Sequence, residues 1–195
     1  PRGYVRDLFD FYAEEFDEHL TEKAGYRVPR LMREIVDRLG PGQSGGDDFP
    51  FERGLDLGCG TGLVGENFSE LVGEFVAVDL APKMVAQATL RGVYDDIHEC
   101  ELLEFFERHA DPEAPFNLVL GADLFIYVGK LDNLFAAVSA HMAPSGLFIF
   151  SVETLAEGTY ALLQSGRYAQ SDAYIENLAE TNGFRIDARD SIVGR

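Results

Sequence analysis

The chain has 195 residues, of which 46% are hydrophobic and 12% aromatic, and this composition predicts a single folded domain with a substantial core. Its 34 acidic residues outnumber its 16 lysines and arginines and give a formal net charge of −18. We therefore expect no nucleic acid as a partner, because a phosphate backbone would be repelled. No apolar run approaches the ~20 residues of a membrane-spanning helix, so we expect no membrane partner either.

The two cysteines, Cys59 and Cys100, lack the spacing of a metal site or of a redox pair. This predicts reduced thiols and no bound metal. Reduced thiols favour a cytoplasmic location, with the removal of an organelle leader left open as an alternative.

Two helices are predicted in residues 1–39, which we expect to cap the domain. The second helix has an apolar stripe over 28–39 and ends at Gly40-Pro41, which are stop signals for a helix. Residues 40–50 are rich in glycine and are predicted to form a flexible tether to an α/β core over residues 51–195. The first helix presents an apolar residue at every fourth position, at Leu8, Tyr12, Phe16 and Leu20.

From residue 51 on, short apolar runs alternate with amphipathic segments, the pattern of parallel strands joined by crossover helices. The predicted strands are Leu55–Leu57, Phe75–Asp79, Val93–His98, Phe116–Ala122, Leu147–Val152 and a last one near Phe184–Val193. The predicted helices start near Leu63, Pro82, Glu101, Lys130 and Ser171. Several strands are apolar on both faces, so we expect a mostly parallel sheet with helices on both sides.

Residues 55–63 read Leu-Asp-Leu-Gly-Cys-Gly-Thr-Gly-Leu, an apolar run followed by three glycines at alternate positions. Glycine has no Cβ, so it can turn tightly off a strand and let the backbone approach a ligand. The segment resembles motif I of the class I S-adenosylmethionine-dependent methyltransferases, whose conserved positions correspond here to Asp56, Gly58, Gly60 and Gly62. The resemblance implies a Rossmann-like sandwich of about seven strands. Because the chain stops after the sixth predicted strand, we expect the last strand to be missing.

The same glycines also fit a second kind of cofactor. Residues 60–65 satisfy the Gly-x-Gly-x-x-Gly fingerprint of dinucleotide-binding folds, with Asp79 at roughly the expected spacing of 20 residues. A pyrophosphate near a helix N-terminus is repelled by carboxylates, whereas the ammonium and sulfonium groups of S-adenosylmethionine are attracted by them. Asp56 therefore favours S-adenosylmethionine, and no Tyr-x-x-x-Lys pair supports a nicotinamide enzyme.

The resemblance also implies which residues hold the cofactor. The loop from Gly58 to Gly62, which includes Cys59 and Thr61, would cradle the methionine and ribose parts. Asp79 ends the second predicted strand, where a carboxylate can accept hydrogen bonds from both ribose hydroxyls.

The adenine is expected against apolar side chains near two strand ends. Leu80 and Met84 would line its edge, although apolar residues at this spacing are equally well explained as core. Glu101-Leu102 follows the third predicted strand, where many family members have an acidic residue before an apolar one. Glu99 or Glu104 could take the role of that acid instead.

Residues 116–123 resemble motif IV, the strand whose end faces the transferred methyl group, and this assigns Ala122 and Asp123 to the cofactor site. The continuation Asp-Leu-Phe-Ile-Tyr-Val-Gly-Lys-Leu is similar to a subgroup of small-molecule methyltransferases classed alongside TPR-repeat methyltransferases. Two other segments that resemble this subgroup are 9–20 and 165–169.

The aromatic residues of the N-terminal segment suggest a lid over the site. Tyr12 would lie near the methionine end of the cofactor, and Phe16 or His19 would face the acceptor. A sulfonium is attracted to the electron-rich faces of aromatic rings. A helix that simply packs on the domain explains the same spacing.

Methyl transfer is an in-line displacement at an activated methyl group, so the protein mainly aligns the acceptor and excludes water. A neutral amine or hydroxyl acceptor also needs a base, for which the candidates are Tyr127, His19, Asp123 and Glu153. Tyr127 is the first choice, although packing at a helix start explains it equally well. The residues predicted to bind the acceptor are Phe16, Phe125, Glu153 and Arg167, the last of which also fits a surface role.

These patterns predict S-adenosylmethionine-dependent methylation of a small-molecule acceptor. One alternative is a protein-directed methyltransferase, which would have a broad groove in place of a capped pocket. The other is a non-catalytic assembly factor that binds the cofactor.

Overall fold

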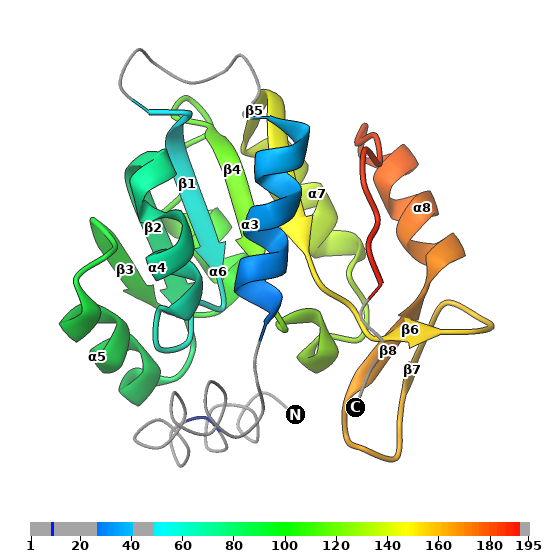
Figure 1. The fold of residues 1–195 in the computed structure, drawn as a ribbon. Helices are drawn as coiled ribbons and strands as arrows, with labels where there is room; N and C mark the ends of the chain where they lie inside the picture. The colour runs from blue at the N-terminus through cyan, green and yellow to red at the C-terminus, as the bar shows by residue number, and fades with distance from the viewer. Residues whose placement is uncertain (1–8, 10–26, 41–48, 192–195) are drawn as a thin grey trace.

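The computed structural model describes Phe9, residues 27–40 and residues 49–191 of the chain. The central feature of this part is a parallel sheet of five strands in the order β3-β2-β1-β4-β5 (Figure 1). The strands are β1 (Phe51–Leu57), β2 (Val72–Asp79), β3 (Asp96–Glu99), β4 (Phe116–Gly121) and β5 (Met142–Phe150). The strand order reverses between β1 and β4, and ligands of such sheets bind beyond the carboxyl ends of the strands at that reversal.

Helices cover both faces of this sheet. They are α3 (Val28–Leu39), α4 (Leu63–Phe68), α5 (Pro82–Arg91), α6 (Leu102–Arg108), α7 (Asp132–Ala140) and α8 (Asp172–Thr181), with the 3-10 turns η2 (Ser69–Leu71) and η3 (Phe125–Tyr127). One core cluster joins α3 and α4 to one face, and the other joins α6, α7 and α8 to the opposite face. The predicted Rossmann-like sandwich is therefore confirmed.

The predicted starts of the crossover helices are confirmed to within two residues. Pro82 lies in the first turn of α5, where its missing N–H costs nothing. Ser171 caps α8, because its side chain accepts a hydrogen bond of 3.2 Å from the N–H of Tyr174. All six residues of β4 are buried, as a strand covered on both faces requires.

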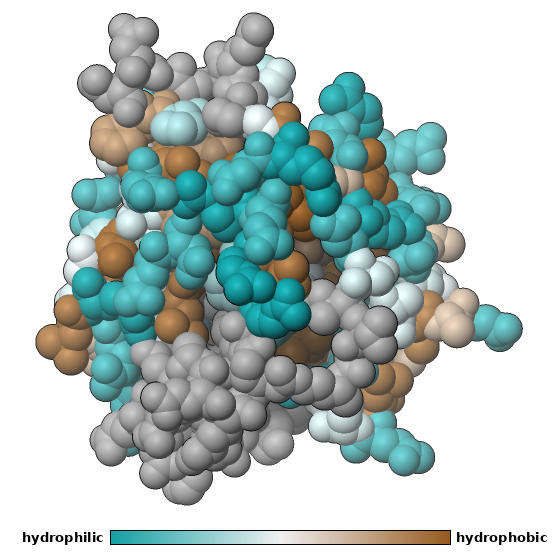
Figure 2. Space-filling view, viewed as in Figure 1, coloured by the Kyte–Doolittle hydropathy of each residue, from teal (hydrophilic) through white to brown (hydrophobic). Residues whose placement is uncertain are grey.

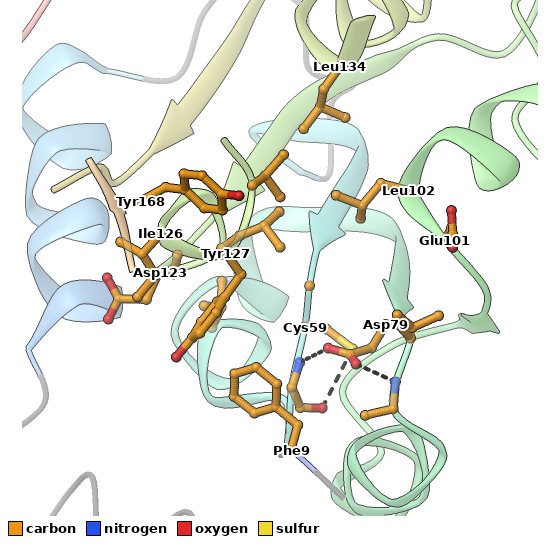
Figure 3. A pocket seen from close by; sticks show the side chains of 18 of the residues that line it. Phe9, Cys59, Asp79, Glu101, Leu102, Asp123, Ile126, Tyr127, Leu134 and Tyr168 are labelled. Carbon is orange, nitrogen blue, oxygen red and sulfur yellow. Dashed lines mark hydrogen bonds between the residues drawn. The ribbon is translucent and has the colours of Figure 1, made fainter. Parts of the chain in front are cut away.

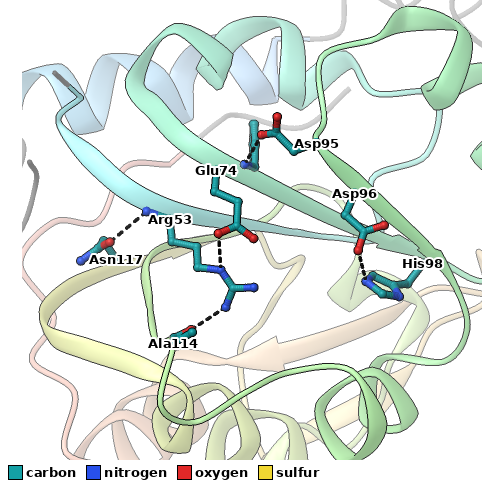
Figure 4. Close-up of polar contacts among 8 residues, drawn as sticks. Arg53, Glu74, Asp95, Asp96, His98, Ala114 and Asn117 are labelled. Carbon is teal, nitrogen blue, oxygen red and sulfur yellow. Dashed lines mark hydrogen bonds and ion pairs between the residues drawn. The ribbon is translucent and has the colours of Figure 1, made fainter.

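Several strand boundaries differ from the prediction. β2 begins at Val72 and β5 at Met142, three and five residues before the predicted starts. β1 begins at Phe51, four residues early, because this buried ring pairs with Val72 of the neighbouring strand. β3 begins at Asp96 and not at Val93. The side chain of Asp95 accepts a hydrogen bond of 2.7 Å from the N–H of Phe75 and so replaces a regular ladder contact at this point (Figure 4).

Arg53 ties the amino-terminal half of β1 to both neighbouring strands (Figure 4). Its Nε lies 3.1 Å from Oε2 of Glu74 on β2, and its Nη1 donates to the carbonyl of Ala114 at 2.5 Å. Its backbone N–H donates to Oδ1 of Asn117 on β4 at 3.0 Å. These contacts fix the register of the three central strands, whose opposite ends carry the site described below.

The segment 153–171, between the fifth predicted strand and the last predicted helix, contains a second sheet. Its three strands are β6 (Thr154–Leu155), β7 (Tyr160–Leu162) and β8 (Tyr168–Ser171), in the order β6-β8-β7. The strands are too short to show a period in the sequence. Their pairing depends on the turn between β7 and β8, where the N–H of Gly166 donates to the carbonyl of Leu163 at 3.0 Å.

The last predicted strand, Phe184–Val193, is wrong for residues 184–191, which form neither strand nor helix. Side chains, not a backbone ladder, hold this segment. The Phe184 ring packs against Phe148, with centroids 5.8 Å apart, and Arg189 pairs with Asp172 and Glu176 of α8. Strand β5 consequently lies at the edge of the five-stranded sheet in the described part of the chain.

Of the predicted N-terminal cap, α3 is confirmed, and Met32 and Val36 bury its apolar stripe against the core. Hydrophilic residues cover its outer face (Figure 2). The first predicted helix lies outside the described residues except for Phe9, as does most of the predicted tether. Among the helices described, none is long and apolar enough to cross a membrane.

Candidate functional site

A cavity of about 670 Å³ opens beyond the carboxyl ends of β1, β2 and β4. Figure 3 shows the glycine loop and Asp79 on one side and Ile126 and Tyr168 on the other. Glu101 and Leu102 at the start of α6 form a third wall. The position matches the crevice at which a doubly wound sheet binds its ligand.

The glycine loop after β1 bends back against β2. Gly58, Gly60 and Gly62 all have positive φ, between 55° and 91°, a region that other residues adopt only with strain. The N–H groups of Gly58 and Cys59 donate to the carbonyl of Val78 at 2.8 and 3.1 Å. A Cβ on Gly58 would lie 2.7 Å from Leu124, so the close packing also requires glycine there.

Asp79 holds this loop from the end of β2. Its Oδ2 accepts a hydrogen bond of 2.9 Å from the N–H of Gly60, and its Oδ1 accepts one of 2.8 Å from the N–H of Ala81 (Figure 3). A carboxylate oxygen can accept more than one hydrogen bond, and Asp79 borders the cavity. It can therefore order the loop and, at the same time, accept hydrogen bonds from hydroxyl groups of a ligand.

Asp56 does not line the cavity, although the sequence analysis expects it at the cofactor. Its side chain is fully buried behind the loop, where the hydroxyl of Tyr94 donates to Oδ2 at 2.5 Å. Its other oxygen, Oδ1, has no hydrogen-bond partner. Burial raises the pKa of Asp56 to about 7, against the lowering effect of the Tyr94 hydrogen bond. The carboxylate thus acts on a ligand only through the loop or as a charge behind it.

Tyr94 packs behind the glycine loop and stabilises it. The sequence analysis did not predict this role. Its hydroxyl also accepts a hydrogen bond of 3.1 Å from the N–H of Gly65 in α4. Its ring lies so close that a Cβ on Gly62 or Gly65 would approach it to 3.3 or 2.6 Å. Arg91 adds a second brace, because its Nε donates to the carbonyl of Thr61 at 2.7 Å.

The end of β4 has unusual backbone geometry at Asp123, whose φ is +50°. Its N–H donates to Oγ of Ser151 at 2.8 Å, and that hydroxyl donates back to Oδ1 of Asp123 at 2.9 Å. This reciprocal pair connects the ends of β4 and β5 and stabilises a conformation that costs about 1–3 kcal/mol in a residue other than glycine. Ala122 and Asp123 both line the cavity.

Tyr127 lies on the cavity wall at the end of η3. The ring of Phe9 packs edge-on against it, with centroids 5.1 Å apart (Figure 3). Phe9 also contacts a small cluster formed by Ala81 and Met84. A residue from the N-terminal segment therefore closes one side of the cavity between η3 and the start of α5.

The structure brings many of the predicted site residues to this one cavity. Those that line it are Gly58, Cys59, Gly60, Thr61, Asp79, Leu80, Glu101, Leu102, Ala122, Asp123, Tyr127 and Arg167. Those outside the described residues are Tyr12, Phe16 and His19. Their assignments stay predictions.

Five predicted residues do not line the cavity: Asp56, Gly62, Met84, Phe125 and Glu153. Met84 and Phe125 are fully buried because their side chains point into the core. Gly62 has already turned away as the N-cap of α4. Glu153 lies before β6, where its carbonyl accepts a hydrogen bond of 2.9 Å from the N–H of Gln170.

The cavity wall also contains residues that the sequence analysis did not select, among them Phe9, Ile126, Lys130, Asn133, Leu134 and Tyr168. Lys130 and Tyr168 lie inside the segments that resemble the small-molecule subgroup, so those segments were the available signal. Among the described residues, no group of three histidine, cysteine, aspartate or glutamate side chains could hold a metal ion.

Part of the chain that forms this site matches a known protein family. Residues 55–148, which run from β1 to β5, match the family model described as a methyltransferase domain. Over these residues the chain is similar to methyltransferase domains. One solved structure that is similar to this chain is described as a complex with S-adenosylmethionine.

The methyltransferase domain has curated relatives in bacteria. The chain is 30% identical over 102 residues to a ubiquinone biosynthesis O-methyltransferase of Bradyrhizobium sp. (strain ORS 278). This match covers 51% of this chain and 39% of that protein. It is 29% identical over 144 residues to a malonyl-[acyl-carrier protein] O-methyltransferase of Bacillus cereus, which covers 71% of this chain and 51% of the relative. The chain thus spans about half or less of the length of these relatives.

Solved structures share the fold. A complex of DhpI with S-adenosylmethionine and HEP has a TM-score of 0.60 and 20% identity, and the match covers 91% of this chain and 86% of that chain. A SAM-dependent methyltransferase from Leishmania major has a TM-score of 0.68 and 15% identity, with 96% and 74% covered. At this level of identity the likeness concerns the fold of the methyltransferase domain.

Proposed function

We propose that this protein transfers a methyl group from S-adenosylmethionine to a small-molecule acceptor. The observation that carries the proposal is the loop at Gly58–Gly60 held by Asp79, inside a methyltransferase domain and beside a cavity of about 670 Å³. Ligand pockets for small molecules typically have ~300–1,000 Å³. The cavity is therefore large enough for a donor and part of a small acceptor.

The residues present fit the donor. The backbone at Gly58 and Gly60 is free of side chains, so a ligand can approach it closely. Asp79 would accept hydrogen bonds from the ribose hydroxyls, and Leu80 and Leu102, which also line the cavity, would flank the adenine. The carboxylates of Asp79, Glu101 and Asp123 favour the positive charge of the donor. Bound there, S-adenosylmethionine supplies an electrophilic methyl group.

The chain's own part in the reaction is to align the acceptor, exclude water and accept a proton where the acceptor carries one. Tyr127 is our candidate for the last task, because it lines the cavity directly after the Asp123 turn. Phe9 covers its ring and shields the site from solvent. His19 remains a second candidate outside the described residues.

One curated relative is a ubiquinone biosynthesis O-methyltransferase, which supports a small-molecule acceptor. The other is a malonyl-[acyl-carrier protein] O-methyltransferase, whose name gives an acyl group on a carrier protein as the acceptor. The segments 9–20, 123–131 and 165–169 support membership of the small-molecule subgroup classed alongside TPR-repeat methyltransferases. The net charge of −18 argues against a nucleic acid as substrate. Two free cysteines support a cytoplasmic location.

The test is a calorimetric titration of the protein with S-adenosylhomocysteine and, separately, with NADH. We expect binding of the first and none of the second. Incubation of the protein with methyl-labelled S-adenosylmethionine and fractionated metabolites should then transfer label to a small molecule. Binding of NADH without S-adenosylhomocysteine contradicts the proposal, and label found only in protein favours the protein-directed alternative.

A further inference from the structure

Two cations stand at the rim of the cavity in a protein dominated by acids. Lys130 and Arg167 both line the cavity, and the chain has only 16 lysines and arginines against 34 acids. Among the described residues, Lys130 has one distant partner, with Nζ 3.8 Å from Oδ1 of Asp132. In the same part of the chain, the guanidinium of Arg167 makes no ion pair and no hydrogen bond. Its backbone N–H donates to Oγ of Ser165 at 3.4 Å, and its carbonyl accepts a hydrogen bond of 2.8 Å from the N–H of Leu163.

Packing between two segments brings these cations together. Gly129 lies against the ring of Tyr168 so closely that a Cβ there would come within 2.7 Å of the ring. Lys130 follows Gly129 in the chain and Arg167 precedes Tyr168, so the two charges flank this contact. Close packing at this contact thus fixes the backbone positions from which the side chains of Lys130 and Arg167 extend.

Gln170 clamps the same two segments together. It is fully buried, and its Nε2 donates to the carbonyls of Phe125 and Val128 at 3.1 and 2.9 Å. A buried amide with two such bonds is costly to displace. Strand β8, which follows Arg167 directly, is therefore held firmly against the turn that leads to Lys130.

The acids of the cavity wall are divided between its two sides. Figure 3 shows Asp79 and Glu101 on the side of the cavity away from Tyr168, whereas Asp123 lies near Ile126 and Tyr168. Ile126 and Leu134 contribute apolar side chains to the cavity wall. The positive centre of the donor is favoured near Asp79 and Glu101, so we assign Lys130 and Arg167 to the acceptor.

We propose that the acceptor carries an oxyanion, a carboxylate or a phosphate, bound by Arg167 and Lys130, on an apolar body that packs against Ile126, Leu134 and Tyr168. Arginine binds such groups through two parallel hydrogen bonds, and lysine adds a point charge. This inference rests on the proposed function, because it assigns the donor to the other side of the cavity.

The test is a matched ligand series added to the protein saturated with S-adenosylhomocysteine and followed by calorimetry. The members are 3-phenylpropionate, 2-phenylethylphosphonate, 3-phenylpropanamide and 3-phenylpropylamine, which share a body and differ in charge. We expect one of the two anions to bind about tenfold more tightly than the amide, the scale of one charge-assisted hydrogen bond. The tighter anion identifies the carboxylate or the phosphate as the group recognised.

Arg167→Gln and Lys130→Gln should each lower the affinity for the anion by about five- to tenfold. The affinities for the amide and for S-adenosylhomocysteine should stay unchanged. Arg30→Gln is the matched control, because it removes an exposed positive charge on α3 whose partner is Glu34 on the same helix. It should change none of these affinities.

Three outcomes overturn the inference: an amide or amine that binds as tightly as the anions, a series in which no member binds, or an Arg167→Gln variant that loses S-adenosylhomocysteine instead of the anion. The last outcome means that Arg167 holds the donor's own carboxylate. Failure of the proposed function is recognised separately, because the wild-type protein then does not bind S-adenosylhomocysteine at all.

Discussion

Two aspartates of the glycine-loop region have opposite environments. Asp79 borders the cavity and accepts hydrogen bonds from two backbone N–H groups. Asp56 is fully buried, with one partner and an unpartnered oxygen, which disfavours charge. The same residue type thus serves as a ligand-facing acceptor in one case and as a support behind the loop in the other.

We expect Asp79→Ala to weaken S-adenosylhomocysteine binding by more than tenfold, on the ~1.5–3 kcal/mol scale of a charge-assisted hydrogen bond. The variant loses both the loop contact to Gly60 and the acceptor for the ribose. Calorimetric titration measures the effect. Glu107→Ala on the exposed face of α6 is the control, and an affinity unchanged in Asp79→Ala would refute the ribose assignment.

Tyr94→Phe should destabilise the fold more strongly as the pH rises above neutrality. Ionisation of Asp56 costs stability because its folded pKa of about 7 lies above the unfolded value, so its contribution to stability is lost as the pH rises through the folded pKa. The Tyr94 hydrogen bond lowers that pKa, and its removal extends the loss to higher pH. The other groups that face Asp56 are Asp79, which raises its pKa further, and the thiol of Cys59, whose own pKa is raised by burial.

Urea unfolding of Tyr94→Phe and the wild type at several pH values between about 6 and 9 measures this difference. The destabilisation should grow by up to about 1.4 kcal/mol per pH unit above neutrality. Tyr160→Phe, on the partly exposed strand β7, should show no such trend. If the destabilisation of Tyr94→Phe were constant with pH, the Tyr94 hydrogen bond would not change the pKa of Asp56.

At the scale of elements, the cavity is closed by two parts outside the central sheet. The ring of Phe9 packs on Tyr127, and the sheet β6-β8-β7 brings Tyr168 and Arg167 to the opposite rim. Neither part supplies a strand to the central sheet. On the proposed function, we expect the sheet and its helices to hold the donor and these added elements to determine which acceptor fits.

Deletion of residues 1–26 tests the role of the N-terminal segment. We expect the domain to stay folded, because α3 keeps its core contacts through Met32 and Val36. Methyl transfer should be abolished, because the Phe9 ring no longer covers Tyr127. Thermal unfolding and transfer of labelled methyl groups measure the two effects. Phe9→Ala serves as the point variant and should reproduce part of the loss; a deletion variant with full activity would exclude the lid.

At the scale of the whole molecule, the net charge of −18 works against compactness, because like charges repel one another. Several surface ion pairs offset this locally, among them Arg33 with Asp37 and Glu70 on α3 and η2. Each such exposed pair contributes only about 0–1 kcal/mol. The remaining repulsion is screened by salt.

We expect the melting temperature at neutral pH to rise by several degrees between about 0.02 and 0.5 M NaCl, since the Debye length falls to a few ångström. Differential scanning calorimetry measures the shift. Near the sequence pI of about 4.4 the same salt step should have little effect, because the net charge is then close to zero. A melting temperature that does not rise with salt at neutral pH contradicts the role of repulsion.

The sequence alone determined the sheet and the glycine loop, since both are local patterns. Apolar runs, Pro82 at a helix start and glycines with positive φ each act over a few neighbouring residues. The carboxyl ends of parallel strands then meet at one edge, so Asp79 and Asp123 could be assigned to one site in advance.

Only the tertiary structure decided the rest, because it depends on contacts between residues far apart in the chain. Asp56 was expected to face the ligand, yet Tyr94, 38 residues away, covers it. The clamp of Gln170 on Val128, 42 residues apart, brings Lys130 and Arg167 to one rim. Residues 184–191 have the apolar content of a strand, but side-chain packing against α8 and β5 takes the place of a backbone ladder.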